Sequence, residues 1–478
     1  MWWERKRARE REREIMKSFV WLCIFFCWLL NRACQADQHA PLQVDDYAYT
    51  IQVDSLFSKP VCTHSTKGLK RESSLEVVHR HGPCTNLPGD APTVSDVLRR
   101  DEARVNWINS KLSINSQPDS ANLPAKDGSS VGSGNYIVSV GFGTPAKYLS
   151  LIFDTGSDLT WTQCKPCIRS CYNQKDPIFD PSLSSSYSNI SCSSDLCSSL
   201  ASGTGNSPGC SSSTCIYGIQ YGDSSFSVGF FGKEKLTLTP RDVFNGFLFG
   251  CGQNNQGLFG GSAGLIGLGR DPLSLPSQTA AKYNKIFSYC LPSSSSSTGH
   301  LTFGAGSTLS RSLKFTPIST FSRSSFYGLD FTAISVGGQK LSIPTSVFSS
   351  GGTIIDSGTV ITRLPSTAYA ALRNAFRQRM KAYPTAPALS ILDTCYDFSG
   401  YKTITVPKIS FFFSGGVEVE IGSVGILYGS GLSQVCLAFA GNSDDGSVGI
   451  FGNVQQQTLE VVYDVGKGRI GFAPGGCS

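Results

Sequence analysis

Two short stretches of the 478-residue chain each place an aspartate between an apolar run and a glycine turn. The first reads LIFDTGS and carries Asp154, and the second reads TIIDSGT and carries Asp356. An aspartate that ends an apolar strand is costly to bury unless it is hydrogen-bonded or functional. Two carboxylates held about 3 Å apart cannot both ionise, so they share one proton. Such a pair can deprotonate a water, polarise a carbonyl group and protonate a leaving amine, which is hydrolytic chemistry.

The two stretches belong to a longer repeat. Each Asp-Thr/Ser-Gly triplet is followed, much later in the chain, by an apolar-apolar-Gly strand, first as LIG at residues 265–267 and then as IFG at residues 450–452. The same elements in the same order predict an internal duplication, with one aspartate from each half. The competing interpretation is that both aspartates merely cap turns.

These residues resemble the pepsin-like aspartic proteases, and more closely their nepenthesin-type plant branch, over about residues 134–478. The resemblance implies a mainly β, bilobal fold with an interlobe active-site cleft. It makes Asp154 and Asp356 the catalytic pair of an aspartic endopeptidase that works at acidic pH and is made as a zymogen. It also implies two further sets of site residues. The active-site support is Thr155, Gly156, Ser157, Ser357, Gly358 and Thr359, and the flap and substrate-binding set is Tyr221, Gly222, Asp223 and Trp161.

Without the resemblance, the flap residues carry less weight. A lone buried aromatic such as Trp161 is more often part of a core than of a site. Tyr221 begins the turn-rich stretch YGDSS, which favours the tip of a hairpin. Such a tip can close over a substrate and exclude water.

The cysteines indicate an oxidising compartment. Seventeen occur, and the twelve from Cys164 to Cys477 permit six disulfides. The alternative is zinc at Cys164, Cys167 and Cys171, but this region holds only one histidine, His300, so we expect no metal and no cofactor. The resemblance implies the pairs Cys164–Cys167, Cys171–Cys251, Cys192–Cys215, Cys197–Cys210, Cys290–Cys477 and Cys395–Cys436.

Composition divides the chain into four parts. Residues 1–36 read as a signal peptide with the apolar core FVWLCIFFCWLL, and Met16 is an alternative start. Residues 37–130 read as a prosegment, with a helix expected over 93–112 and an exposed linker over 116–134. The expected N-terminal lobe is 131–315, with a Cys-rich insert at 164–215, and the C-terminal lobe is 316–478. A further helix is expected over 366–383, with Ser366 as its N-cap.

The prosegment is expected to be inhibitory, because a basic side chain neutralises the carboxylate pair in zymogens of the family that the chain resembles. The candidate side chains are Lys59, Lys67, Lys70, Arg71 and Arg80. The alternative is that residues 37–130 form a permanent N-terminal domain.

Net charge limits the partners. The formal charge is +6, and the nearest basic cluster, Arg373 to Lys381, fits a solvated helix face, so we expect no nucleic acid. Expected partners are protein or peptide substrates of a secreted monomer without a membrane anchor, in the apoplast or alternatively in the vacuole or a plastid.

Asn189 begins the one glycosylation sequon of the mature region. The alternative functions are a catalytically silent inhibitor or binding protein on this fold and a nucleoid-associated DNA-binding protease. A serine or cysteine protease would need His300, and the two Gly-x-Ser-x-Gly stretches, from Gly128 and from Gly260, lack the strand-to-helix turn of a nucleophile elbow.

Overall fold

The computed structural model describes residues 3, 46–57, 61–68, 71–85, 87, 92–113, 136–221, 225–257, 259–308, 310, 312–321 and 325–477. The signal peptide and the linker expected over 116–134 therefore lie outside the described residues, apart from Trp3. The chain divides into two compact units, residues 1–46 and 47–478, and the second unit holds the fold described below. No helix in the described part is long and apolar enough to cross a membrane.

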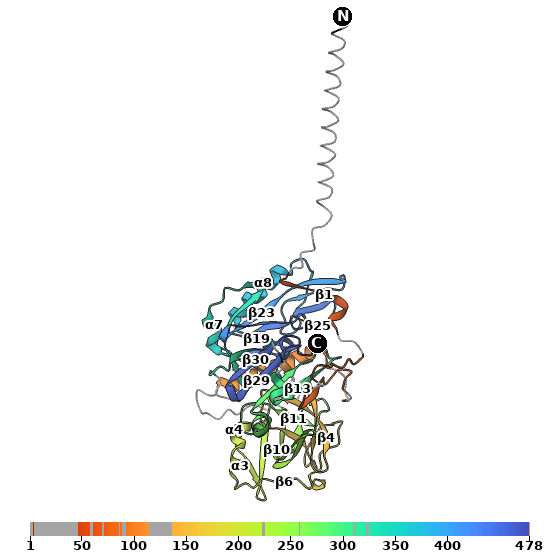
Figure 1. Ribbon diagram of the computed structural model, residues 1–478, viewed down its shortest axis with the longest axis vertical. Helices are drawn as coiled ribbons and strands as arrows, with labels where there is room; N and C mark the ends of the chain where they lie inside the picture. The colour runs from red at the N-terminus through yellow and green to blue at the C-terminus, as the bar shows by residue number, and fades with distance from the viewer. Residues whose placement is uncertain are drawn as a thin grey trace. The chain divides into compact units, whose positions relative to one another are not determined.

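Strands dominate the second unit (Figure 1), as the sequence predicts. The largest sheet runs in the order β14 (Lys314–Pro317), β30 (Arg469–Ala473), β29 (Glu460–Asp464), β12 (Ile286–Cys290), β13 (Thr298–Phe303), β2 (Ser74–His79), β3 (Tyr136–Phe142), β4 (Lys147–Asp154), β11 (Gly264–Gly267), β5 (Trp161–Gln163), β10 (Asp242–Gln256), β9 (Phe226–Thr239), β8 (Thr214–Gln220) and β7 (Gly209–Ser211), with β6 (Ser188–Asn189) beside β9.

Four smaller sheets complete the described strands. The first runs in the order β15 (Tyr327–Leu329), β18 (Thr353–Ile355), β28 (Gly449–Phe451), β19 (Thr362–Leu364) and β27 (Phe439–Gly441). The second runs β17 (Gln339–Lys340), β16 (Phe331–Val336), β23 (Ile409–Phe413) and β24 (Val417–Glu420), and the third runs β20 (Thr385–Ala386), β21 (Cys395–Tyr396), β26 (Gln434–Leu437) and β25 (Leu427–Gly431). The fourth is the pair β1 (Ala48–Gln52) and β22 (Thr403–Pro407).

In the described part of the chain, helices are few and mostly short. They are α2 (Val94–Ser113), α3 (Asp195–Ser198), α4 (Leu200–Thr204), α5 (Leu275–Gln278), α6 (Ala280–Tyr283), α7 (Thr345–Gly351), α8 (Ser366–Arg379) and α9 (Asn453–Gln456). The helix expected over 93–112 is confirmed as α2. The helix expected over 366–383 is α8, but Ser366 is its first residue and Pro365 occupies the N-cap position. Ser366 does not cap the helix, because its Oγ donates to Oδ1 of Asp445 at 3.0 Å.

The predicted duplication is present in the strand order. In one half β11 pairs in parallel with β4 and antiparallel with β5, and β5 pairs in parallel with β10. In the other half β28 pairs in parallel with β18 and antiparallel with β19, and β19 pairs in parallel with β27. The orders β4-β11-β5-β10 and β18-β28-β19-β27 therefore correspond strand by strand. Asp154 ends the first strand of its set, and Asp356 directly follows the first strand of the other.

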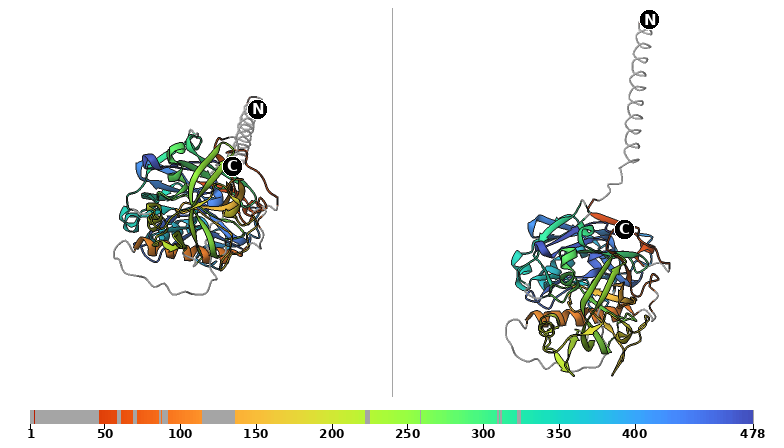
Figure 2. Two further views of the ribbon diagram at one scale, coloured as in Figure 1. Left: turned by 90° about the horizontal axis from the view of Figure 1, so that it is seen from below. Right: turned by 60° about the horizontal axis from the view of Figure 1, so that its bottom comes forward.

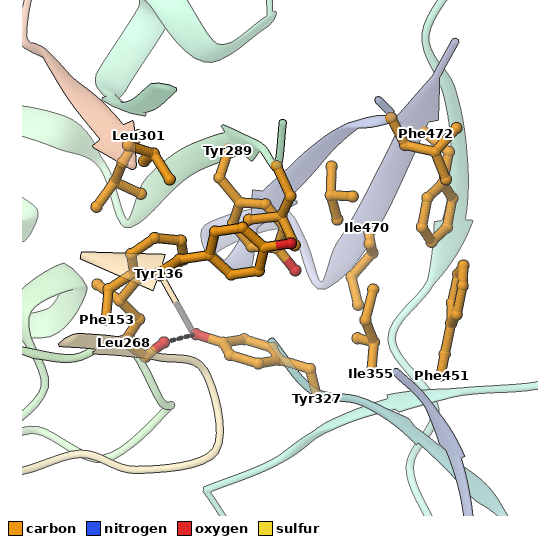
Figure 3. Packing of buried hydrophobic residues seen from close by; sticks show 14 of the residues in the cluster. Tyr136, Phe153, Leu268, Tyr289, Leu301, Tyr327, Ile355, Phe451, Ile470 and Phe472 are labelled. Atoms are coloured by element: carbon orange, nitrogen blue, oxygen red, sulfur yellow. Dashed lines mark hydrogen bonds between the residues drawn. The ribbon is translucent and has the colours of Figure 1, made fainter. Parts of the chain in front are cut away.

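Buried apolar side chains hold the two aspartate-bearing strands in place (Figure 3). Phe153, next to Asp154, packs against Tyr136 and Tyr289, with ring centroids 6.4 and 5.8 Å away. Tyr327 of β15 donates a hydrogen bond from its hydroxyl to the carbonyl of Leu268, at 2.8 Å, and so ties a strand of the second half to the first. Burying a large apolar side chain contributes about 1.5–3 kcal/mol, so these contacts fix the strand ends firmly.

The region expected to be a prosegment is built into the fold. β1 pairs with β22, and β2 lies between β13 and β3 within the largest sheet. The disulfide Cys62–Cys84 closes the loop around β2. In Figure 2 the orange helix α2 crosses the body between its mainly blue and its yellow-green parts.

The disulfides differ from the implied pairing at four of six bridges. The structure contains Cys290–Cys477 and Cys395–Cys436 as implied, but it joins Cys164–Cys251, Cys167–Cys171, Cys192–Cys210 and Cys197–Cys215. Strand pairing explains the first change, because the amide of Cys164 binds the carbonyl of Gly252 beside Cys251. The Cα atoms of Cys164 and Cys251 are 5.3 Å apart, which suits a bridge. All three cysteines of the suggested zinc site are oxidised.

Candidate active site

Both aspartates stand where a buried strand turns into a glycine loop. Asp154 is the last residue of β4, and Asp356 directly follows β18. A Cβ atom at Gly358 would lie 2.6 Å from Oδ1 of Asp154, and one at Gly156 would lie 2.8 Å from Oδ1 of Asp356. Any larger residue would collide with the carboxylate of the opposite loop. The glycines therefore let the two loops approach each other.

Reciprocal hydrogen bonds lock the two loops together. The amide of Thr155 donates to Oγ of Ser357 at 3.1 Å, and the amide of Ser357 donates to Oγ1 of Thr155 at 2.9 Å. The two hydroxyl oxygens are 3.3 Å apart. Because both residues are buried, water does not compete for these bonds. The arrangement holds the carboxylates in fixed positions.

Each carboxylate also has local donors. The amides of Gly156 and Gly358 each donate to Oδ1 of the aspartate two residues earlier, both at 3.1 Å, and Thr359 donates from Oγ1 to Oδ2 of Asp356 at 2.6 Å. Burial raises the pKa of the Asp154 carboxyl, and the nearby hydroxyl of Ser157 opposes that rise. Among the described residues, however, neither Oγ of Ser157 nor Oδ2 of Asp154 has an aligned hydrogen-bond partner.

A basic side chain from α2 binds both aspartates at once. Arg104 donates from Nη2 to Oδ1 of Asp154 at 2.7 Å and to Oδ1 of Asp356 at 2.9 Å. Its Nε donates to Oδ2 of Asp356 at 2.8 Å. One nitrogen atom thus contacts the inner oxygen of each carboxylate. All three side chains are at least nine-tenths buried.

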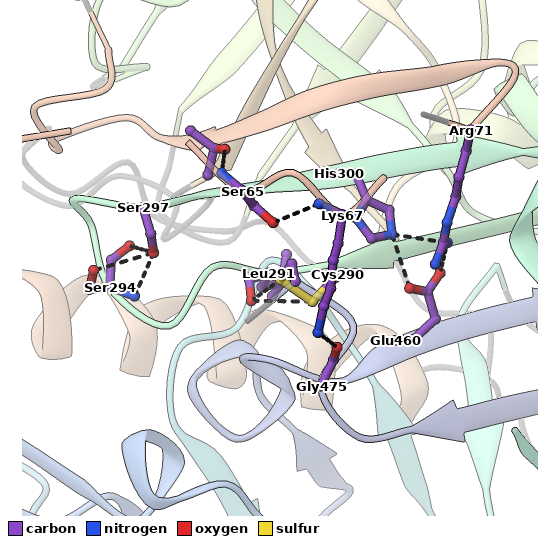
Figure 4. Close-up of a disulfide and its surroundings, with 12 residues drawn as sticks. Ser65, Lys67, Arg71, Cys290, Leu291, Ser294, Ser297, His300, Glu460 and Gly475 are labelled. Atoms are coloured by element: carbon purple, nitrogen blue, oxygen red, sulfur yellow. Dashed lines mark hydrogen bonds and ion pairs between the residues drawn. A yellow bond between two sulfur atoms is a disulfide. The ribbon is translucent and has the colours of Figure 1, made fainter. Parts of the chain in front are cut away.

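The three described residues of the five basic candidates named from the sequence have other partners. Lys67 donates to the carbonyl of Gly475, and Arg71 pairs with Glu460 at 2.6 Å (Figure 4). Arg80 donates to His81. Lys59 and Lys70 lie outside the described residues.

A signal for Arg104 was present in the sequence. The apolar positions Leu98, Val105 and Ile108 recur at helical spacing, and Asp101 and Arg104 fall among them on the same face. Charged residues on an apolar helix face need buried partners, so this pattern singles them out.

The net pKa shifts of the two carboxyls are opposite in direction. Burial raises the pKa of Asp154, and the neighbouring Asp356 adds to that effect against the charge of Arg104. Burial also opposes ionisation of Asp356, but Arg104, the hydroxyl of Thr359 and the amide of Gly358 outweigh it and lower the pKa of that carboxyl. Burial disfavours the charged form of Arg104, yet the two aspartates outweigh this and raise the pKa of the guanidinium. Arg104 therefore stays charged.

Tyr221 lies in the hairpin that β8 and β9 form, as the sequence predicts. Tyr221 follows β8, and its amide binds the carbonyl of Ser225 just before β9. Trp161 donates from Nε1 to the hydroxyl of Tyr221 at 2.7 Å, and both side chains are buried. The flap residues Gly222 and Asp223 lie outside the described residues.

The serine-protease interpretation does not fit this arrangement. His300 lies 3.0 Å from a carboxylate oxygen of Glu460 and also contacts Arg71 (Figure 4). Ser262, in the Gly-x-Ser-x-Gly stretch before β11, donates to the carbonyl of Phe259 instead. The nucleophile and base of a serine protease would have to be hydrogen-bonded to each other.

Comparison with known proteins agrees with this geometry. The family descriptions "Xylanase inhibitor N-terminal" and "Xylanase inhibitor C-terminal" match residues 136–305 and 326–474. An aspartyl protease family protein of Arabidopsis thaliana is 62% identical over 476 residues, covering 97% of this chain and 100% of that protein. Aspartic proteinase nepenthesin-2 of Nepenthes gracilis is 39% identical over 395 residues, covering 80% and 86%. The chain belongs to the nepenthesin-type, pepsin-like aspartyl protease family.

Solved structures support the same fold for this aspartyl protease family member. Conglutin gamma, a basic 7S globulin from lupine seeds, superimposes with a TM-score of 0.57 at 22% identity, over 70% of this chain and 90% of that one. At this identity the likeness concerns the fold alone. The bilobal pepsin-like architecture predicted from the sequence is therefore confirmed.

Proposed function

We propose that this protein is an aspartic endopeptidase whose carboxylate pair is Asp154 and Asp356. The observation that carries the proposal is that one guanidinium nitrogen contacts the inner oxygens of both carboxylates. Freed of Arg104, the two oxygens can bind one water molecule at the position that Nη2 now occupies, within hydrogen-bond distance of both. One carboxylate takes a proton from that water, which attacks the scissile carbonyl, while the other polarises the carbonyl oxygen and later protonates the amine.

The flap and the support residues have distinct parts in this proposal. Thr155 and Ser357 keep the carboxylates from separating, and Thr359 orients Asp356. Tyr221 stands at the start of the hairpin tip, and its hydrogen bond to Trp161 fixes the position of its ring. The tip closes over an extended peptide and excludes water from the scissile bond.

The chain is made as a zymogen in this proposal. Arg104 neutralises the pair and occupies the position that the attacking water needs. Cleavage in the region 114–135, between α2 and β3, separates the inhibitory segment from the catalytic body. Acid then weakens the contact with Arg104, and the enzyme acts at acidic pH.

The enzyme is exported in this proposal. Seven disulfides occur among the described residues, and such a number persists only in an oxidising compartment. Asn189 is exposed and is available for glycosylation. The protein acts on protein or peptide substrates as a secreted monomer.

A catalytically silent relative is the second candidate. The matching family descriptions name a xylanase inhibitor, which shows that the scaffold is not confined to proteases. The intact pair Asp154 and Asp356, with its glycines and hydroxyls, favours catalysis over this alternative.

The test is cleavage of a denatured protein from pH 2 to pH 8, after verified removal of the prosegment. Acid-optimal cleavage should be blocked by the statine inhibitor pepstatin and should fall by at least about 10³-fold in Asp154→Asn and in Asp356→Asn. Folded, processed protein that cleaves nothing at any pH would instead favour the silent scaffold.

A further inference from the structure

Tyr172 of the Cys-rich insert lies between two backbone attachments to the stretch that joins β10 to β11. The carbonyl of Ser170 accepts a hydrogen bond from the amide of Asn255, near the end of β10, at 2.7 Å. The amide of Lys175 donates to the carbonyl of Gly261, just before β11, at 3.0 Å. The insert is therefore fixed to this stretch on both sides of Tyr172.

The backbone of Tyr172 itself is also held. Nε2 of Gln163 donates to the carbonyl of Tyr172 at 3.0 Å. Gln163 ends β5, the short strand that begins with Trp161. The disulfide Cys167–Cys171 closes the loop that directly precedes Tyr172. These contacts restrict where the ring of Tyr172 can lie.

The ring of Tyr172 reaches the flap residues through one phenylalanine. Its centroid lies 4.9 Å from that of Phe259. Phe259 in turn packs edge-on against Trp161 at 5.0 Å and against Tyr221 at 6.2 Å. Phe259 is 4% exposed, and it shares a buried cluster with Trp161 and Tyr221, against which Tyr172 packs. Because edge-on aromatic pairs favour particular orientations, these rings form a continuous packed path from the insert to Tyr221.

The ring of Tyr172, rather than its hydroxyl, makes this contact. Among the described residues the buried hydroxyl oxygen of Tyr172 has no aligned hydrogen-bond partner. A phenylalanine at this position would keep the ring contact with Phe259. A leucine would leave a gap beside Phe259, into which that ring could move. The two substitutions therefore separate the packing of the ring from the presence of the hydroxyl.

Phe259 contacts both Trp161 and Tyr221, so a shift of its ring affects both side chains together. The hydrogen bond from Trp161 to the hydroxyl of Tyr221, at 2.7 Å, is directional and needs both rings at fixed orientations. We propose that Tyr172 is a positioning residue, which holds Phe259 against these two rings and so sets the orientation of Tyr221 beside the substrate. The Cys-rich insert thereby influences catalysis through the rings of Tyr172 and Phe259. This inference rests on the proposed endopeptidase function.

The first test measures the hydrogen bond without any cleavage. In the precursor with isotope-labelled tryptophan, the indole N–H signal of Trp161 is assigned by its loss in Trp161→Phe. Hydrogen exchange at this group should be at least about tenfold faster in Tyr172→Leu than in wild type, because the bond opens more often. In Tyr172→Phe the rate should stay within about twofold of wild type. The control is Tyr187→Leu, in the same insert, where the ring packs against Phe249 at 6.2 Å, and its rate should also stay within about twofold.

The second test is kinetic. In the processed enzyme, kcat/KM on one peptide should fall about tenfold in Tyr172→Leu, and by less than about twofold in Tyr172→Phe and in Tyr187→Leu. Tyr221→Phe removes the hydroxyl to which Trp161 donates. In this background Tyr172→Leu should cost less than about twofold further, because no hydrogen bond is left to orient. Should Tyr172→Leu fail to fold, Phe259→Leu removes the same contact with the flap residues and carries the same expectations.

Two results would overturn the inference. In the first, the indole proton of Trp161 exchanges at the wild-type rate in Tyr172→Leu. In the second, Tyr172→Phe is impaired as strongly as Tyr172→Leu, or the separate losses in Tyr172→Leu and Tyr221→Phe multiply in the double variant. A processed wild type that cleaves no peptide, while the exchange rates are as expected, would contradict the endopeptidase function and support the positioning role, so the two failures can be told apart.

Discussion

The guanidinium of Arg104 donates two hydrogen bonds to the carboxylate of Asp356, from Nε at 2.8 Å and from Nη2 at 2.9 Å. Such a bidentate pair matches the planar fork of arginine to both oxygens of the carboxylate. Because the same Nη2 also reaches Asp154, α2 is attached to the two halves of the duplicated body at their point of contact.

Removing this guanidinium should activate the unprocessed chain. Breaking a buried, hydrogen-bonded ion pair costs about 3–5 kcal/mol, so Arg104→Gln should weaken the hold of α2 strongly. We expect the intact Arg104→Gln precursor to hydrolyse a fluorogenic peptide at least about tenfold faster than the intact wild type, with intact mass verified before and after the assay. Arg99→Gln, an exposed position of the same helix, is the control. Equal latency of all three proteins would rule out Arg104 as the inhibitory group.

Release of α2 should depend on acid, with a sign set by Asp356. Arg104 lowers the pKa of this carboxyl, so their contact stabilises the docked helix above the carboxyl's ordinary pKa and is lost as the pH falls. Asp101 acts in the opposite sense, because burial raises its pKa against the pull of Arg363 and of two backbone amides. We expect Asp356 to dominate the pH dependence of docking, so α2 should be released below about pH 4–5.

Trp107 provides a probe of this release. It lies on α2 and packs edge-on against Phe326, with ring centroids 6.5 Å apart. Its fluorescence should change over the same pH range in which activity appears, and Trp107→Phe should lack the change. In Arg104→Gln the transition should lose its acid dependence, and an unchanged transition there would contradict the role given to the pair.

Asp158 should make the fold less stable as the pH rises. Burial raises its pKa to about 7, against hydrogen bonds from Ser325 and the amide of Asp271. Because the folded pKa lies above the unfolded value of about 4, the stability contribution is complete below pH 4 and is lost as the pH rises through 7. Asp158→Asn keeps an acceptor for the amide of Asp271 but has no charge. Its unfolding free energy at pH 8 should exceed that of wild type by on the order of 3 kcal/mol, and the two should agree near pH 4.

The pairing within the Cys-rich insert can be tested with double variants. Replacing Cys197 and Cys215 by serine removes one complete bridge and should cost about 2–4 kcal/mol of unfolding free energy without exposing a thiol. Replacing Cys192 and Cys215 instead leaves Cys197 and Cys210 unpaired, and two free thiols should appear in a titration of the folded protein. If free thiols appear in the first double variant and none in the second, the pairs are Cys192–Cys215 and Cys197–Cys210, as the family resemblance implies.

The sequence by itself determined the chemistry and the symmetry of this protein. Asp154 and Asp356 follow apolar strands and precede glycines, and these local requirements are written in neighbouring residues. The helix over 94–113 was equally predictable, since its apolar positions recur at helical spacing. Local patterns of this kind depend on backbone geometry within a few residues, which a single sequence reveals.

Only the tertiary structure decided which side chains meet across long separations. Arg104 lies 252 residues from Asp356, and no periodicity relates them. The same holds for Asp101 with Arg363, and for Cys164 with Cys251, which strand pairing brings together. Such contacts arise from how the strands and α2 pack, and many pairings fit the same local sequence. The chain therefore revealed which carboxylates could act, while its folding determined which guanidinium binds both of them.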